Sequence, residues 1–503
     1  MFLLEEPTLS TSVAAAQEER TISGVVSLLF LSETDLLGPH DAFPDPRLYK
    51  RVSKAIHALF AKLCDRPGKI ARALRKGIAR FVTNKRLQGS RMIAHVVNSN
   101  ARLLREETRV VLCHDTSEID RHGRGVPDDA GPLRSPQARG YLLQVAVATT
   151  LAGRLCGAVN AFVWTRSWNL RRGDHRSRPA SEKESRKWDR SIDQAEKRLR
   201  KQGFAGEIFH TADREADDYT TLANQQAKGR LLIVRRDIRG RPRQIETSER
   251  AQKRSHSRWS SLESKLNALP FRGSYQVEID SPQVDRARGL THAVRQATVH
   301  FRYAEVTLKP PLRYRGSARS GLTVWVVEAK EREPPPGVEP LHWQLTSLSP
   351  VRSDDEARLI VQIYKRRWKV EDYLKITKSG CQLEEQHIDS LASFERLLAL
   401  TLGAANQLVE LVALAREEPP RPLPEVLPPQ VIAAVRDAAD YHRVRWTPEP
   451  TAPQLLLTVA KIGGYEWCKI RPHPGWLVLT RGWVRVLEHQ AIVTRDRERR
   501  GPS

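Results

Sequence analysis

The stretch Thr108–Asp115, TRVVLCHD, decides the fold expected for this chain, because it is a continuous apolar run that ends in a carboxylate. A short apolar run of this kind predicts a buried β-strand. Two more apolar runs follow at residues 140–150 (GYLLQVAVATT) and 153–165 (GRLCGAVNAFVWT), with a short Ala-Gly turn between them. Together the three runs predict an antiparallel meander of three strands.

Helices and strands alternate after this meander. Residues 181–202 are charged with helical spacing, residues 206–213 (GEIFHTAD) predict a fourth strand, and residues 230–236 (RLLIVRR) predict a fifth, with a helix at about 215–227 between them. Three strands followed by helix, strand, helix and strand indicate an α/β fold with a mixed sheet. In a sheet of this order the first and fourth strands can lie side by side.

Shifts in composition divide the rest of the chain. A long helix is predicted from Ser353, which has capping-box spacing to Glu356, as far as Ser379. The predicted segments are a poorly ordered leader at 1–40, a helical domain at 41–104, an α/β core at 105–239 and 351–416, an antiparallel β insertion at 240–350, a Pro-rich linker at 417–430, and a C-terminal helical module at 431–503.

The charge of the chain narrows the class of partner. Lys and Arg number 83 against 59 Asp and Glu, a formal charge of +24, which favours a polyanion such as nucleic acid. The five cysteines are scattered and odd in number, which argues against a disulfide framework and a zinc ribbon and favours a reducing cytosol. We expect no membrane segment, because the apolar stretch 25–31 is too short, and no nucleotide cofactor, because a phosphate-binding GxxxxGK[ST] loop is absent.

Four polar residues share one stripe of the predicted long helix. Tyr364, Arg367, Glu371 and Lys378 lie at i, i+3, i+7 and i+14, which places them within about 60° of one another around the axis. A carboxylate among cations and a hydroxyl suits metal-assisted phosphodiester chemistry. The alternative is a solvated helix with ordinary ion pairs, which this segment alone would favour.

Two further carboxylates follow predicted strands. Asp115 follows the first strand and Asp213 the fourth, where an acidic side chain is costly unless a cation or hydrogen bonds compensate it. The alternatives are a turn former at Asp115 and a helix cap at Asp213. If both converge with Glu371, the three oxygen ligands suffice for Mg²⁺ and for in-line displacement at a phosphate.

These residues resemble those of a known family, the cut-and-paste DDE transposases of bacterial insertion sequences with a ribonuclease-H-like core. The family carries a Y-x₂-R-x₃-E-x₆-K motif, which Tyr364, Arg367, Glu371 and Lys378 meet at every spacing. The stretches HDTS at 114–117, ADREAD at 212–217 and KESRKW at 183–188 resemble three more of its boxes. The resemblance covers roughly residues 41–490 and implies a ribonuclease-H-like mixed sheet interrupted by a β insertion.

The resemblance also implies a role for each matched residue. Asp115, Asp213 and Glu371 would be catalytic and would bind two Mg²⁺ ions, for which Mn²⁺ can substitute. The DNA-binding residues would be Tyr364, Arg367 and Lys378 at the backbone phosphates, Trp343 stacked on an extruded base, and Arg80 in the N-terminal domain. Arg235 and Arg236 fit a basic edge that faces DNA, and a solvated strand end fits them as well. Trp343 taken without the family would be a core tryptophan.

The implied partner is double-stranded DNA, both the terminal inverted repeats and the target, in a homodimer on the cytoplasmic, nucleoid side of a bacterial cell. The N-terminal domain would bind the ends, and the C-terminal module would support the dimer. The sequence departs from the family at Ala79, where a Tyr is usual, and at Asp372, where many relatives have Glu. Two other functions stay open: a non-catalytic DNA-binding derivative of a transposase, and a ribonuclease-H-like nuclease without strand transfer.

Overall fold

The computed structural model of this chain describes residues 82–489 with internal gaps, so the predicted leader at 1–40 and Arg80 lie outside the described residues. The gaps are residues 122–125, 169–182, 239–242, 248–257, 280–282, 286–289, 293–294, 417–421 and 468–473, and positions 313, 337, 382, 387, 428, 484 and 487–488.

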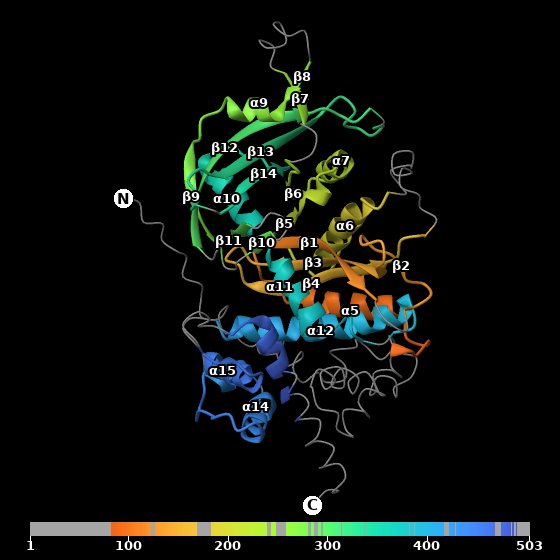
Figure 1. Cartoon of the computed structure of the whole chain (residues 1–503), viewed down its shortest axis with the longest axis vertical. Coiled ribbons are helices and arrows are strands. Elements are labelled where there is room, and N and C mark those ends of the chain that lie inside the picture. The colour runs from red at the N-terminus through yellow and green to blue at the C-terminus, as the bar shows by residue number, and fades with distance from the viewer. Residues whose placement is uncertain are drawn as a thin grey trace, which may run out of the picture.

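A large mixed sheet runs through the described part (Figure 1). In its core region the strand order is β4-β3-β1-β5-β6, with a short β2 also on β3. The long strands β1, β3 and β4 pair antiparallel in that order along the chain, whereas β5 and β6 run parallel to β1. The bounds are β1 Arg109–Asp120, β2 Gly131–Pro132, β3 Arg139–Thr149, β4 Leu155–Trp164, β5 Glu207–Ala212 and β6 Leu231–Arg235. The predicted meander and the contact between the first and fourth long strands are therefore confirmed.

Helices cover both faces of these strands, which explains why the strands are apolar throughout. On β1 the odd residues Val111 and Cys113 pack in the cluster that includes α11 and α12. The even residues Val110 and Leu112 pack in the cluster that includes α6. The bounds are α6 Arg186–Lys201, α11 Lys369–Lys375 and α12 Leu391–Leu414. Because side chains alternate along a strand, this division sets which face each later residue of β1 presents.

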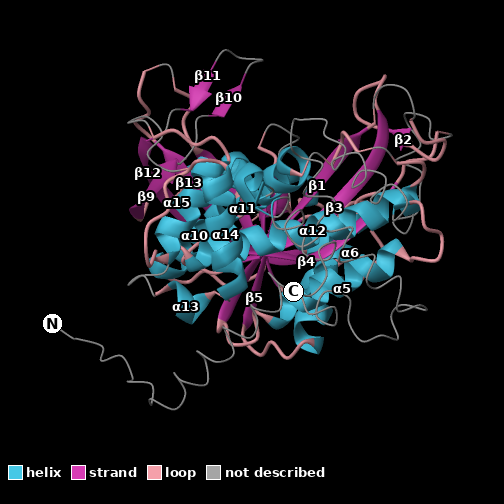
Figure 2. Cartoon of the chain, turned by 90° about the horizontal axis from the view of Figure 1, so that it is seen from below, coloured by secondary structure: helices cyan, strands magenta, loops and turns pink. Residues whose placement is uncertain are grey.

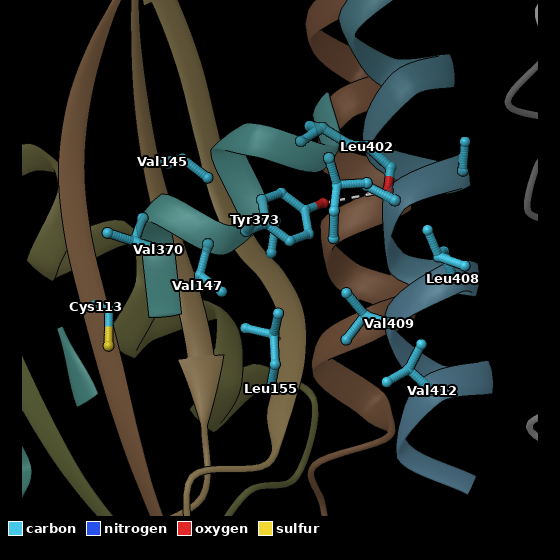
Figure 3. Packing of buried hydrophobic residues seen from close by; sticks show 14 of the residues in the cluster. Cys113, Val145, Val147, Leu155, Val370, Tyr373, Leu402, Leu408, Val409 and Val412 are labelled. Carbon is cyan, nitrogen blue, oxygen red and sulfur yellow. Dashed lines mark hydrogen bonds between the residues drawn. The ribbon is translucent and has the colours of Figure 1, made fainter. Parts of the chain in front are cut away.

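Helix α11 lies between the sheet and α12 (Figure 3). Its residues Val370 and Tyr373 are fully buried among Val145 and Val147 of β3 and the apolar side chains of α12. The Tyr373 hydroxyl donates to Asn406 Oδ1 at 2.7 Å and lies 3.3 Å from the Leu402 carbonyl. The hydroxyl therefore has a partner in an otherwise apolar layer, which fixes the distance between the two helices.

Helix α12 is the core helix of the protein. Among the described residues it is the one helix whose length and hydropathy would suffice to cross a membrane, but 89% of its most apolar window is buried inside the protein. It packs on β4 and on α5, Gly89–Arg102 (Figure 1). Its apolar surface is thus used by the fold itself. Helix α5 is the described end of the segment predicted as an N-terminal domain.

Antiparallel strands fill the predicted insertion and continue the central sheet instead of forming a separate one. Strand β14 pairs antiparallel with β6, and β13, β12 and β9 follow outward. Their bounds are β9 Gly273–Ile279, β12 Arg295–Leu308, β13 Leu322–Glu331 and β14 His342–Ser347, and the small elements at the edge are β7 Gln244–Glu246, β8 Trp259–Ser261 and α9 Leu262–Asn267. A separate pair is formed by β10 Gln283–Asp285 and β11 Leu290–His292.

The long helix predicted from Ser353 to Ser379 is interrupted. Ser353 and Glu356 form the predicted capping box, and α10 covers Asp354–Arg366. A turn at Arg367 and Trp368 then leads into α11, which ends in a π-helical turn, Ile376–Gly380. At the break the carbonyl of Arg366 accepts a hydrogen bond from Cys113 Sγ at 3.1 Å, so the sheet takes over a partner that the helix loses.

The C-terminal part contains the helices α13 Leu423–Val426, α14 Pro429–Tyr441 and α15 Ala452–Ile462, and residues 476–483 are helical as well. Helices α14 and α15 pack together beneath α12 (Figure 1; Figure 2 views the molecule from this side). Thr451 and Gln454 form a capping box at the start of α15. The predicted C-terminal module thus begins with helices.

Candidate active site

Asp115 lies within β1 and not at its end, because β1 continues to Asp120. The parallel pairing of β1 with β5 stops earlier, at Cys113 opposite Thr211. Asp115 is therefore just beyond the point where one neighbouring strand has ended, on the same face as Cys113. Its side chain is 19% exposed, and its Oδ1 accepts from the Thr116 backbone N–H at 2.8 Å.

Asp213 follows directly after β5 and lies as far beyond Thr211 as Asp115 lies beyond Cys113. Its Oδ1 accepts from the backbone N–H of Glu215 at 2.9 Å and so caps the short turn that follows. The cap expected as an alternative is therefore present. The charge of Asp213 also acts to raise the pKa of the Asp115 carboxyl.

Glu371 comes from the first turn of α11, on the side of the sheet that Asp115 faces. Arg367 joins the two: its guanidinium is 2.7 Å from Glu371 Oε1 and 4.0 Å from Asp115 Oδ2. Arg367 is 8% exposed, whereas the Glu371 side chain is 40% exposed. The buried end of the ion pair is thus the cation, and the carboxylate is the partner with room to move.

Burial dominates the electrostatics of this group. It raises the pKa of Asp115 to about 6, against the opposing charge of Arg367, and Asp213 and Glu371 raise it further. Burial also raises the pKa of Asp213, although the Glu215 N–H opposes this. For Arg367, burial acts to lower the pKa, but the neighbouring acidic groups outweigh it and raise the pKa overall. These carboxylates therefore lack a full complement of compensating positive charge.

Trp343 does not have the exposure that stacking on a base requires. It is 3% exposed in β14, and its ring packs edge-on against Tyr364 at 5.4 Å and Trp368 at 6.3 Å between centroids. The core tryptophan expected without the family is what the structure contains. The packing of α10 over β14, which buries this ring, was not visible in the sequence, and base stacking by Trp343 stays a prediction that requires the ring to become exposed.

Tyr364 is also buried, at 1% exposure, and the charges of Arg367 and Arg235 act on its hydroxyl. Lys378 has partners other than the three carboxylates. It donates to the Glu118 carbonyl at 2.8 Å and pairs with Glu384 at 3.1 Å. Part of the predicted stripe is present: Arg367 contacts Glu371 and its charge acts on Tyr364, so these three stay together across the turn at Arg367. Lys378 follows the π-helical turn and has the other partners named above.

The two arginines after β6 have different surroundings. Arg235 is half-buried beside Tyr364. Arg236 is 3% exposed and is held by Glu263 and by the side chain of Gln344. Arg236 thus bridges the core to the inserted strands, and the DNA-facing role of the two arginines stays a prediction.

Two features of the site were not predicted. Lys187, within the KESRKW stretch, pairs with Glu215 at 3.0 Å and its charge acts on Asp213. On the opposite face of β1 and β5, His114 Nε2 and His210 Nδ1 form a fully buried contact of 2.9 Å. The sequence signal for the second was available: each histidine is a polar residue within an apolar strand run, one position before Asp115 and three before Asp213, so both lie out of phase with the acid that follows.

A polar pocket of about 600 Å³ lies at the other end of β1 and β5. Its charges are paired with one another, Arg109 with Glu207 and Arg230 with Glu196, both at 2.7 Å. Asp115, Asp213 and Glu371 do not line this pocket.

The donor chemistry of the site suits a divalent ion, since carboxylate oxygens are the ligands that Mg²⁺ and Mn²⁺ prefer. The elevated pKa of Asp115 points the same way, because a nearby cation would remove that penalty. Within the described residues, no three acidic, histidine or cysteine side chains are already grouped closely enough to hold an ion. Arg367 lies between Asp115 and Glu371 and forms ion pairs with both carboxylates.

Comparison with known proteins adds a family to this geometry. Residues 172–407 match a family model described as "Transposase DDE domain", a range that includes Asp213 and Glu371 and begins after Asp115. A cryo-EM structure of the piggyBac transposase synaptic complex with hairpin DNA is similar at a TM-score of 0.32 and 9% identity, over 80% of this chain and 75% of that chain. A TM-score this low does not establish a shared fold. The family match supports a DDE transposase.

Proposed function

From the match to a transposase DDE domain, we propose that this chain is a DNA transposase that cuts and rejoins DNA through Asp115, Asp213 and Glu371. The observation that carries the proposal is the position of the first two acids. They lie in equivalent places beyond the last pair of two adjacent parallel strands, and Glu371 lies on the helix above them. Rigid elements hold all three, which is what positioned catalysis requires.

The chain's own residues divide the work. Asp115 and Asp213 supply oxygens from the sheet, and Glu371 supplies a third from α11 once it has left Arg367. Arg367 then neutralises the phosphate at the cleavage point, and its fork geometry suits two phosphate oxygens. A divalent ion, Mg²⁺ or Mn²⁺, supplies Lewis-acid activation of the phosphodiester and of the attacking oxygen.

The biological setting we propose is a bacterial insertion sequence of the Y-R-E-K type with a ribonuclease-H-like core. The order β4-β3-β1-β5-β6, with β1 next to β5, supports such a core. The net charge of +24 supports binding to terminal inverted repeats and target DNA. A homodimer across two paired ends, in the cytoplasm at the nucleoid, completes the proposal.

The test is DNA cleavage by variants of single acids. Asp115→Asn and Glu371→Gln remove one ligand charge each while keeping the shape of the side chain. On DNA that carries the inverted repeats flanking the gene, in Mg²⁺ or Mn²⁺, we expect both to cleave at least about a hundredfold more slowly than wild type, a loss above that of residues that only support a ligand.

Asp372→Asn is the matched control. Asp372 is the next residue on α11, and its carboxylate contacts Lys369 and Lys375 at 3.7 and 3.6 Å, so its loss should leave cleavage within about threefold of wild type. Wild-type cleavage rates in Asp115→Asn or Glu371→Gln would refute this site.

A non-catalytic DNA-binding derivative is the second candidate, favoured by the Arg367–Glu371 ion pair that keeps Glu371 from the other acids. Binding of the terminal repeats without nicking in either metal would support it.

A further inference from the structure

Arg367 stands where a cation is needed among the catalytic acids. Its guanidinium donates to Glu371 Oε1 at 2.7 Å and approaches Asp115 Oδ2 at 4.0 Å, and its charge also acts on Asp213. We propose that Arg367 is a built-in placeholder for the metal, which holds Glu371 in the free protein and releases it when a DNA phosphate takes the guanidinium. The proposal rests on the function proposed above and adds its regulation: DNA binding should raise the affinity for metal.

The neighbouring cations are committed to other partners, which makes Arg367 specific for this task. Arg366 Nε donates to the Leu151 carbonyl at 2.8 Å. Lys369 contacts Asp372, and Lys378 pairs with Glu384. Arg367 is thus the basic residue of this helix pair whose charge lies among all three acids.

The Arg367–Glu371 pair competes directly with a metal ion. The guanidinium already neutralises the carboxylate at Glu371 Oε1, and its positive charge repels a second cation at the same carboxylate, so the arginine weakens metal binding while it stays there. Asp115, at 4.0 Å, is attracted to Arg367 without a close hydrogen bond. Opening the site therefore requires one hydrogen-bonded ion pair to break, and Glu371 is the exposed partner that can turn away.

Arg367 also keeps a donor in reserve. Its Nε is buried and makes no hydrogen bond to the described residues. A guanidinium binds phosphate best through two parallel N–H donors, so a phosphate would engage Nε together with one Nη once the guanidinium has turned Nε out of its buried position. The gain of that second hydrogen bond is what allows a phosphate to draw Arg367 from Glu371.

Two ligands that favour the same state of one residue must help each other. If phosphate binding frees Glu371, the metal binds more tightly to the DNA complex than to the free protein, and metal tightens DNA binding by the same factor. A coupling of roughly tenfold lies within the range usual for linked sites.

The experiment measures Mn²⁺ binding by calorimetry or electron paramagnetic resonance, without DNA and with a terminal-repeat duplex whose scissile linkage is blocked. Mn²⁺ held by DNA itself is subtracted with the Glu371→Gln complex. We expect wild type to bind Mn²⁺ roughly tenfold more tightly with DNA. Arg367→Gln should bind Mn²⁺ more tightly than wild type without DNA, and DNA should add little.

Arg366→Gln is the matched control, because it removes the same charge one residue away and should keep the wild-type response to DNA. Arg367→Lys is a second variant, which keeps the charge beside Glu371 but cannot offer two parallel donors, so its response to DNA should fall below that of wild type. Unchanged or weaker Mn²⁺ binding in DNA-free Arg367→Gln, or a wild-type response to DNA in Arg367→Gln or Arg367→Lys, would overturn the proposal.

Failure of the proposed function has a different result. If wild type and Glu371→Gln bind Mn²⁺ equally, with and without DNA, the acids are not a metal site and the placeholder role falls with them. A metal site that depends on Glu371 but ignores DNA would overturn the placeholder role alone.

Discussion

Burial is the main cause of the pKa shifts of two carboxyl groups in this protein. Asp115 and Glu410 are the two carboxyl groups whose pKa burial raises to about 6 and about 7, with one arginine opposing it in each case, Arg367 and Arg154. The proposed function accounts for the burial of Asp115, because a bound cation would offset the cost of burying its charge. Glu410, on α12 far along the chain from the candidate ligands, has none that the fold reveals.

Glu410 gives a prediction about stability and pH. Its folded pKa, about 7, exceeds the ordinary value of 4.5, so its contribution is fully favourable below pH 4.5 and is lost as pH rises toward 7. Glu410→Gln should therefore gain on the order of 2 kcal/mol relative to wild type at pH 8 compared with pH 4.5. Denaturant unfolding at the two pH values measures this, and an equal difference at both would contradict it.

Trp343 gives a prediction that separates its two roles. As a core residue, 3% exposed, it should cost about 3–5 kcal/mol in unfolding free energy when changed to Ala. An exposed base-stacking tryptophan would cost almost nothing. Trp467→Ala, at a site 65% exposed, is the control and should change stability by less than about 0.5 kcal/mol. If the two changes lowered the unfolding free energy equally, Trp343 would be an exposed residue and not a core residue.

At the scale of elements, the two strands that carry the first two acids are tied together on their other face. His114 Nδ1 contacts Ser191 Oγ at 2.8 Å, His114 Nε2 contacts His210 Nδ1, and His210 Nε2 contacts Glu196 Oε2 at 2.9 Å. Burial lowers the pKa of both histidines, and neutral rings with the proton on Nε2 satisfy every contact in one direction. This chain connects β1 and β5 to α6.

The contact between the strands can be tested by choosing which ring nitrogen is imitated. His114→Gln places an amide near Nε2 and should retain the contact with His210, whereas His114→Asn reaches only the position of Nδ1. We expect His114→Asn to lose about 1–3 kcal/mol of unfolding free energy, and His114→Gln clearly less. Chemical unfolding at pH 8 compares them, and the reverse order would show that the contact with Ser191 matters more.

At the scale of the whole molecule, one sheet links the acids to the inserted strands. Strand β14 pairs with β6, which pairs with β5, the strand before Asp213. Arg236 and Gln344 hydrogen-bond across the junction of core and insertion. The insertion is therefore not an appendage, and α10 packs on it before the chain turns into α11.

The amino-acid order alone determined the five long strands of the core and their order along the chain, the capping box, and the three acids as candidates. Apolar runs and the Ser-x-x-Glu spacing of a capping box are local patterns, so they can be recognised without knowing which distant segments pack nearby. The adjacency of the strands before Asp115 and Asp213 also followed, because few orders of a mixed sheet are possible.

Only the tertiary structure decided what each side chain touches. At the break after Arg366, the freed carbonyl accepts from Cys113, which is 253 positions away in the chain, and no local pattern could have indicated that contact. Trp343 is a core residue because α10 crosses β14 and places Tyr364 against its ring. Arg236 is buried where Glu263 and Gln344 bind its guanidinium. Contacts between distant segments depend on how elements pack, and the period of a sequence carries no record of that packing.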